Sequence, residues 1–346
     1  MAEYISVDGR RVRVRPNETV SETDAYGNFH RQANRFTEGF GPGKNPVEAD
    51  RYILFWAKGC HWSNRASIVR ELLGLEDAVK AEIVGWDDAP YEKPLGWEFV
   101  NSPDHINPET GCRFLSEIYE HTDPSYEGRA TVPAFVDYRT GKVANNDYNR
   151  LTNYLEADFR PFHREGAPDL YPEDLRGEID SLNDWLFDNV NNAIYRAQFA
   201  QTLQAFSDAY ETFFSGLDAM DRRLSGQRFL FGDYVTDSDV RLFVTLARFD
   251  VGYSRNIGPC LKRLVDYENL WGYARDLYQI PAFFHNTYFK DFASTRKHPP
   301  EQAEYFDSVY YDIVIPAADF DAVWKTPTGR EKLSRDPANK FRREKE

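Results

Sequence analysis

An α/β domain followed by an all-helical domain is the fold class that the sequence predicts, and three observations support it. In the first half of the chain, short apolar runs rich in branched and aromatic residues, typical of strands, alternate with helical spacing. From Pro172 onward the apolar residues recur only at intervals of three and four, which indicates helices throughout. With 346 residues, the chain is long enough for each domain to bury a core of its own.

The sequence divides into four segments. Residues 1–50 are polar and rich in glycine and proline, and we interpret them as an N-terminal arm. Residues 51–160 carry the α/β pattern, and residues 169–324 form the expected helical domain. Residues 325–346 are charged and contain proline, which is typical of an exposed tail.

The α/β domain begins with a predicted β-α-β unit. Residues 51–57 are aromatic and branched, as expected of a buried strand, and a polar turn around Cys60 interrupts them. Helical spacing of apolar residues then continues to Gly74, a residue typical of helix ends. Residues 81–84 predict the second strand, which completes the unit.

A hairpin and a further helix follow in the same domain. Residues 130–144 contain two short apolar runs around a Thr-Gly turn, and Asp147 is placed to open the next helix. The resulting order, β-α-β, a long insertion and then β-β-α, is that of a thioredoxin-like domain.

The clearest helix start in the second domain lies within residues 235–240. Thr236 is expected at the N-cap, with Asp239 at the third helical position as an acidic substitute for glutamate, so the segment resembles a capping box. The pattern predicts a helix that runs to Phe249.

The composition excludes several classes of partner. A formal net charge of −14 repels nucleic-acid phosphates and anionic lipid head groups, and no run of lysine or arginine in the main body compensates it locally. The N-terminus lacks the apolar core of a signal peptide, and no segment approaches the roughly 18 apolar residues of a membrane span. We therefore expect a cytoplasmic protein with neither a nucleic-acid nor a membrane partner.

Neither a disulfide framework nor a metal site is expected. The three cysteines, Cys60, Cys112 and Cys260, are too few and too scattered for a disulfide framework, which suits a reducing compartment. The seven histidines include no pair at metal-ligand spacing, and no cluster of cysteine, histidine and acidic residues resembles a zinc or iron site.

Cys60 is the candidate nucleophile. At the N-terminus of a helix, unpaired backbone N–H groups and the helix dipole would stabilise an anionic sulfur. Glycine before it and polar residues after it favour an exposed turn over the core position that most isolated cysteines occupy. Because Ser63 stands where a C-x-x-C motif has its second cysteine, an external thiol must resolve any disulfide on Cys60. We assign structural roles to Cys112 and Cys260.

Two further segments are candidates for ligand binding. Val132–Pro133 is a candidate cis peptide bond that would leave the backbone of Val132 free to pair with an extended ligand, although an ordinary edge-strand proline explains the spacing equally well. Residues 145–148 lie at a helix start, where N–H groups could meet a carboxylate, but the same pattern is a common helix cap.

Together these pieces resemble the glutathionyl-hydroquinone reductases, the xi class of the glutathione transferases. The resemblance covers roughly residues 50–290 and lies in many short motifs in the same order, which makes it specific for the fold. Besides the Cys60-x-Trp62 turn with Arg65, the matching motifs are residues 51–52, 96–99, 123–129, 131–133, 145–146, 169–172, 191–200, 230–233, 241–243, 248–250 and 269–273.

The resemblance implies a two-domain enzyme, expected as a homodimer, in which an all-helical glutathione-transferase domain follows the thioredoxin-like one. The cysteine that matches Cys60 attacks the sulfur of an S-glutathionyl-hydroquinone, releases the hydroquinone and forms a mixed disulfide that a second glutathione resolves. The thiol cosubstrate would be held by Trp97, Arg129, Val132, Pro133, Asp147 and Tyr148, and the aromatic substrate would meet Tyr195 and Tyr253 of the helical domain.

Two departures from the family pattern bear on substrate choice. The usual Cys-Pro-Trp-Ala is Cys-His-Trp-Ser here, so an imidazole replaces the proline beside the thiol. His61 either helps to stabilise the thiolate or points to solvent, and we favour the second interpretation. The Glu-Ser pair that contacts the γ-glutamyl end of glutathione is replaced by Asp147 and the bulky Tyr148.

Three functions therefore stay open. The leading one is a thiol-dependent reductase that cleaves S-glutathionyl-(hydro)quinones or related thioethers. The second keeps Cys60 and its chemistry but uses another low-molecular-weight thiol, such as mycothiol or γ-glutamylcysteine. The third is a catalytically silent, transferase-like binding protein. Conventional conjugation is less favoured, because a cysteine nucleophile forms a disulfide with the thiol instead of activating it.

Overall fold

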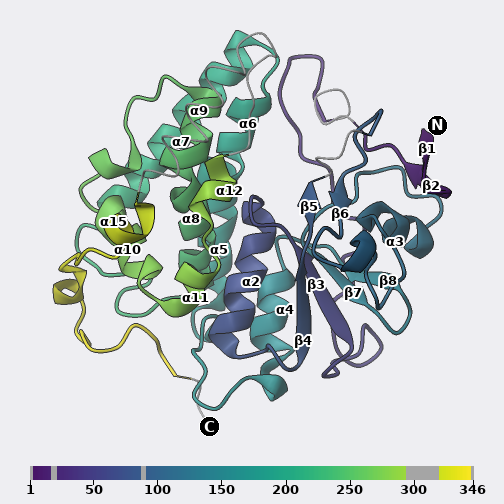
Figure 1. Cartoon of the computed structure of the whole chain (residues 1–346). Coiled ribbons are helices and arrows are strands. Elements are labelled where there is room, and N and C mark those ends of the chain that lie inside the picture. Colours follow the sequence, from purple (N-terminus) through teal and green to yellow (C-terminus); the bar gives the residue numbers. More distant parts are fainter. Residues whose placement is uncertain (1–2, 17–21, 87–90, 294–318, 344–346) are drawn as a thin grey trace. The chain divides into compact units, whose positions relative to one another are not determined.

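The computed structural model describes residues 3–16, 22–86, 91–293 and 319–343, and the chain divides into two compact units (Figure 1). The first unit contains Met1–Glu22 and His30–Glu165. The second contains Gly166–Glu346 together with the short segment Thr23–Phe29.

A four-stranded sheet forms the centre of the first unit. Its strand order is β4 (Val79–Ile83), β3 (Tyr52–Trp56), β7 (Ala134–Asp137) and β8 (Lys142–Asn145). β3 runs parallel to β4 and antiparallel to β7, and β7 and β8 form an antiparallel hairpin. Every residue of the central strand β3 is buried, which explains its uniformly apolar sequence.

Two helices cover one face of this sheet. α2 (His61–Leu73) and α4 (Leu151–Ala157) pack side by side there (Figure 1). α2 ends at Gly74, whose φ of 69° is left-handed and whose N–H donates to carbonyls of the last helical turn. The order β3-α2-β4, then β7-β8-α4, confirms the predicted thioredoxin-like arrangement.

The insertion between β4 and β7 supplies the opposite face. It contains the antiparallel ribbon of β5 (Gly85–Trp86) and β6 (Trp97–Glu98), a 3-10 turn at Pro103–His105, and α3 (Leu115–Thr122), which packs against β8. Alternate side chains of β3 and β7 point toward α3, because successive residues of a strand face opposite sides of the sheet. They form one hydrophobic cluster with residues of α3.

The N-terminal residues, expected as an arm, contain regular structure. β1 (Tyr4–Val7) and β2 (Arg10–Arg13) pair as an antiparallel hairpin. Its two turn residues, Asp8 and Gly9, have φ values of 48° and 79°, as a two-residue type I′ turn requires.

The segment Thr23–Phe29 packs with the helical unit. Gln201 N–H donates to the carbonyl of Gly27, and the Thr202 hydroxyl donates to the carbonyl of Tyr26. Gly27 has a φ of +84°, and a Cβ there would lie 2.7 Å from Thr202 Cγ2, so only glycine fits this close approach.

Among the described residues, the regular elements of the second unit are helices, as predicted, and residues 294–318 of the predicted helical domain lie outside the described residues. At its centre, every residue of α8 (Asp237–Arg248) is buried. Its N-cap is Thr236, and Asp239 completes the capping box, which confirms the sequence interpretation. The remaining elements, in chain order, are α5 (Arg176–Leu186), η3 (Phe187–Asn191), α6 (Ala193–Phe199), α7 (Leu203–Arg223), η4 (Phe249–Tyr253), α9 (Ser254–Ile257), η5 (Leu264–Asp266), α10 (Leu270–Tyr278), α11 (Pro281–His285), α12 (Phe289–Ala293), α15 (Phe320–Trp324) and η7 (Arg330–Leu333), and a 3-10 turn, η2 (Arg160–Phe162), closes the first unit.

The charged C-terminal segment is packed as far as residue 343. The buried guanidinium of Arg330 donates to the carbonyls of Leu224, Gln227 and Arg228, just beyond the end of α7. A charged side chain can be buried here because backbone acceptors replace its water. Across the described part of the chain, none of the helices combines the length and the apolar character that a membrane crossing requires.

Candidate active site

Cys60 lies in the turn between β3 and α2, where it is the N-cap residue of α2. Its N–H donates to the carbonyl of Ala57 at 3.0 Å, and its own carbonyl accepts from Asn64 N–H at 3.1 Å. The residue is half-buried, and Sγ lies 3.6 Å from the carbonyl oxygen of Val132. The predicted position at a helix N-terminus is therefore observed.

His61 corrects one expectation. We expected the imidazole to point to solvent, but His61 is fully buried and its ring meets that of Trp62 edge-on at 4.1 Å. His61 is the first residue of α2, and all but two of the residues in this helix are buried. The polar sequence around Cys60 thus reflects polar groups inside the structure rather than an exposed loop.

The other two cysteines have different surroundings. Burial raises the pKa of Cys112, and the nearby charge of Glu117 raises it further. Burial raises the pKa of Cys260 to about 11, and Asp250 adds to the shift. Thiols with raised pKa values are weak nucleophiles at neutral pH.

Val132 and Trp97 lie at the same hydrophobic cluster as Cys60. The Val132–Pro133 peptide bond is cis, and β7 begins directly after it, between two other strands, so Pro133 does not belong to an edge strand. Trp97 in β6 pairs with Trp86, and the two indole rings pack edge-to-face at 4.7 Å. Three predicted site residues are thus brought together.

Arg129 already has a partner inside the protein. Its guanidinium forms a 2.6 Å ion pair with Glu22, and both side chains are less than a tenth exposed. Gln32 accepts from the Arg129 N–H at 2.7 Å and donates to the Arg129 carbonyl at 3.2 Å. A ligand carboxylate that reaches Arg129 therefore meets a charge that Glu22 partly neutralises. Neither Glu22 nor Gln32 was predicted from the sequence, since both precede the predicted domain.

Asp147 forms a closed turn before α4. Its carboxylate accepts from Asn149 N–H and from the Asn34 amide, and its own N–H donates to the Asn145 side chain. The N–H of Asn146 donates to the carbonyl of Phe36. These two N–H groups, expected to meet a ligand carboxylate, already have protein acceptors.

Tyr148 packs against Trp62, with ring centroids 4.8 Å apart. The guanidinium groups of Arg31 and Arg65 lie 4.5 Å and 4.7 Å from the centroid of the same indole. Each is close enough for a cation–π interaction. Burial raises the pKa of the Tyr148 phenol, which stays protonated at neutral pH. The phenol that replaces the family's serine is thus part of an aromatic and cationic cluster.

Tyr195 and Tyr253 meet within the helical unit. Tyr195 lies on α6 and Tyr253 in η4, and their hydroxyl oxygens are 3.1 Å apart, at hydrogen-bond distance. Their rings pack edge-to-face at 5.7 Å. The two tyrosines were predicted to serve one substrate, and the fold brings them together across 58 positions of sequence.

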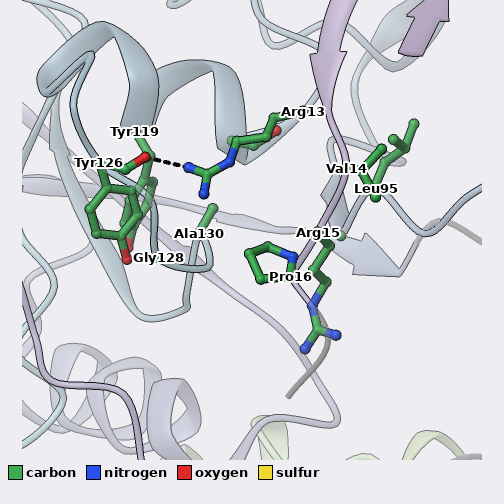
Figure 2. A pocket seen from close by; sticks show the side chains of 11 residues that line it. Arg13, Val14, Arg15, Pro16, Leu95, Tyr119, Tyr126, Gly128 and Ala130 are labelled. Atoms are coloured by element: carbon green, nitrogen blue, oxygen red, sulfur yellow. Dashed lines mark hydrogen bonds between the residues drawn. The ribbon is translucent and has the colours of Figure 1, made fainter. Parts of the chain in front are cut away.

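A pocket in the first unit is lined in part by chain neighbours of two predicted site residues (Figure 2). It is lined by Arg13 at the end of β2, by the residues 14–16 that follow, and by Gly96, Gly128 and Ala130, the chain neighbours of Trp97 and Arg129. The guanidinium of Arg13 closes one side, where it donates to the carbonyls of Tyr126 and Glu127. Within the described residues, no group of three cysteine, histidine or acidic side chains could hold a metal ion.

Comparisons with known proteins agree with these features. Residues 196–276 match the model of the glutathione S-transferase C-terminal domain. The glutathionyl-hydroquinone reductase YqjG of Escherichia coli (strain K12) is 33% identical over 267 residues, which cover 74% of this chain and 80% of the relative. The glutathionyl-hydroquinone reductase PcpF of Sphingobium chlorophenolicum is 34% identical over 70% of this chain and 76% of its own length.

Solved structures are similar along most of the chain. The glutathione-bound structure of the Escherichia coli K-12 protein YqjG superposes with a TM-score of 0.71 and 30% identity, covering 86% of this chain and 96% of that one. The xi-class glutathione S-transferase of Phanerochaete chrysosporium has a TM-score of 0.72 and 35% identity, covering 78% and 88%.

Proposed function

Since the chain belongs to the glutathionyl-hydroquinone reductases, the xi class of the glutathione transferases, it is an enzyme of this type, and we propose that it cleaves S-glutathionyl-(hydro)quinones or related thioethers through a mixed disulfide on Cys60. The observation that carries the proposal is the half-buried sulfur of Cys60 at the N-cap of α2. The positive end of a helix dipole attracts an anionic sulfur at that position.

The reaction would proceed in two exchanges at sulfur. The Cys60 thiolate attacks the sulfur of the conjugate, so an S–S bond forms while the C–S bond breaks. The electron pair of that bond stays on the ring carbon, which then takes up a proton and gives the hydroquinone. A second thiol, as thiolate, attacks the outer sulfur of the mixed disulfide, releases Cys60 and leaves as a disulfide.

We assign the cosubstrate to residues of the first unit and the aromatic substrate to the second. Trp97, Arg129, Val132, Pro133, Asp147 and Tyr148 would form the thiol site, within a thiol-binding domain at residues 51–160. In that site the bulky ring of Tyr148 would limit which thiol fits. Tyr195 and Tyr253, in the substrate domain at residues 169–324, would donate hydrogen bonds to a hydroquinone oxygen and polarise the ring as the C–S bond breaks. The adjacent hydroxyl groups of the two tyrosines support this assignment.

Glutathione is the proposed cosubstrate, with one alternative of the same chemistry. The ring of Tyr148 against Trp62, and Glu22 on Arg129, alter the proposed thiol site, and the alternative is another low-molecular-weight thiol, such as mycothiol or γ-glutamylcysteine. We further propose that the enzyme works in the cytoplasm as a homodimer, on small-molecule conjugates and without a metal.

A panel of thiols against one conjugate tests these proposals. Purified protein is mixed with the S-glutathionyl conjugate of menadione and with glutathione, γ-glutamylcysteine or mycothiol in turn, and the released quinol is measured. We expect release of the quinol with at least one of the thiols. When no thiol is added, we expect the mass of the Cys60 peptide to increase by one glutathionyl group from the conjugate. Rapid conjugation of chlorodinitrobenzene without any such adduct would contradict the proposal. Binding of the conjugate without turnover would indicate a silent binding protein.

A further inference from the structure

The turn that contains Cys60 is held by hydrogen bonds of a buried side chain. It begins at Ala57, the last residue before the polar loop, and it ends in the first turn of α2. Ser63 Oγ lies inside this turn, 3.1 Å from the Ala57 nitrogen, 3.3 Å from the Cys60 carbonyl oxygen and 3.5 Å from the Ala57 carbonyl oxygen. Ser63 is fully buried, so water does not compete for these bonds.

The three backbone partners of the Ser63 hydroxyl determine where it donates and where it accepts a hydrogen bond. The Ala57 N–H donates to Ser63 Oγ, and the single hydroxyl proton can then be donated to the carbonyl of Cys60 or to that of Ala57. The hydroxyl thereby links the end of the strand segment to the backbone of Cys60 across the loop. All the partners that the structure gives this hydroxyl are backbone atoms, so it acts on the sulfur only through the chain.

Two residues of this turn, His61 and Ser63, differ from the family pattern, and the two differences can be related to each other. The xi-class turn has proline after the cysteine, and the ring of proline fixes φ of the first helical residue near −65°. His61 stands there instead, so the backbone of this turn lacks that restraint. Ser63, where the family pattern has alanine, supplies two hydrogen bonds within the same few residues.

We propose that the Ser63 hydroxyl is a positioning group that replaces the missing proline. It holds Cys60 in its extended N-cap conformation, with φ −83° and ψ 111°, and so keeps Sγ at the N-terminus of α2, beside the Val132 carbonyl. The inference rests on the proposed function, because it matters for catalysis only if Cys60 is the nucleophile. It deepens that function by naming a residue whose side chain never touches the substrate.

The test compares three single variants by the rate of Cys60 alkylation with iodoacetamide at neutral pH. The rate is followed on the Cys60 peptide by mass spectrometry, so that Cys112 and Cys260 do not contribute. We expect Ser63→Ala to slow alkylation about tenfold and to lower kcat equally with little change in KM, since small misplacements of a reacting group are costly. Ser63→Thr keeps the hydroxyl and should stay within about twofold of the parent.

Ser67→Ala is the matched control. Ser67 is also buried on α2, one turn further on, where its hydroxyl donates to the Asn64 carbonyl at 2.9 Å and accepts from the Asn64 amide at 3.1 Å. Its loss should lower the unfolding temperature as Ser63→Ala does, yet leave Cys60 alkylation unchanged. The inference is overturned if Ser63→Ala alkylates as fast as the parent, or if Ser67→Ala slows alkylation as much.

The same measurements keep the two proposals apart. If Cys60→Ser retained reductase activity, the proposed function would fail, while the alkylation rates would still decide whether Ser63 positions the sulfur. If Cys60→Ser were inactive and Ser63→Ala reacted normally, only the inference about Ser63 would fall.

Discussion

Cys60 and Cys260 present two similar thiols in opposite settings. Both are half-buried and free, and each sulfur lies near one backbone carbonyl, Val132 at 3.6 Å for Cys60 and Ser254 at 3.7 Å for Cys260. Cys60 precedes a helix of 13 residues, whereas Cys260 follows the end of a short helix and senses the charge of Asp250. Because the two thiols are similarly exposed, the proposal that Cys60 reacts and Cys260 does not rests on the surrounding dipoles and charges rather than on exposure.

The largest test of this contrast removes each sulfur in turn. Cys60→Ser should lower kcat/KM for conjugate reduction by about a thousandfold or more, because serine cannot form the mixed disulfide. Cys260→Ser should stay within about twofold of the parent. Both variants are assayed at saturating thiol. Residual activity above a tenth of the parent in Cys60→Ser would assign the chemistry to another group.

Selective alkylation measures the contrast directly. At pH 7 we expect iodoacetamide to modify Cys60 about a hundredfold faster than Cys260, because little of a thiol with a raised pKa is ionised. The pKa of Cys260 is about 11, so its rate should rise about tenfold per pH unit until pH approaches that value. A Cys260 rate that levels off near pH 9 would show that burial does not protect this thiol.

The raised pKa of Cys260 also makes the free energy of unfolding depend on pH. The pKa of Cys260 is raised from 9.0 to about 11 in the folded chain, so the folded state holds this proton more tightly. The protonated thiol therefore adds to the free energy of unfolding below pH 9, and this contribution is lost as the pH rises toward 11.

Replacing Tyr148 separates the reactivity of the sulfur from the choice of cosubstrate. Tyr148→Ser restores the smaller side chain of the family pattern, and we expect the KM for glutathione to fall about tenfold while Cys60 alkylation stays unchanged. Tyr138→Ser is the control, since this phenol binds the Asp50 carbonyl at the surface. If the KM for glutathione rose in Tyr148→Ser, the phenol would be a glutathione contact instead of an obstacle.

The smallest expected effect concerns Asp250. Its charge is the second cause of the raised pKa of Cys260, after burial. Asp250→Asn should speed alkylation of Cys260 at pH 9 about threefold and leave Cys60 unaffected. The peptide-level alkylation assay resolves both sites in one experiment, and an unchanged Cys260 rate would leave burial as the whole cause.

Local signals in the sequence predicted the helix starts and ends. Each of these signals acts within a few residues, so it can be recognised without the fold. They are the capping box of Thr236 and Asp239, the glycine at position 74 and the strand before Cys60. The family resemblance named Val132 and Tyr195 as site residues, and the structure places them near Cys60 and Tyr253 respectively, while their roles stay predictions.

Contacts between distant segments escaped prediction. Glu22 reaches Arg129 across about a hundred residues, and Arg330 reaches the carbonyls beyond α7 from a segment whose charge suggested an exposed tail. Neither interaction leaves a periodic trace, because a single ion pair or a single guanidinium makes it. The burial of His61 was also missed, because the polarity of a side chain next to Cys60 does not by itself show that the side chain reaches solvent.

The placement of Thr23–Phe29 has a consequence for how this protein can be divided. The polypeptide passes between its two units three times, at Glu22, at Phe29 and at Glu165. A single cut near residue 165 therefore cannot yield two complete modules, since the C-terminal fragment would lack the strip that fits against Gln201 and Thr202. A truncation that treats the two units as separable at residue 165 therefore removes contacts from the helical unit.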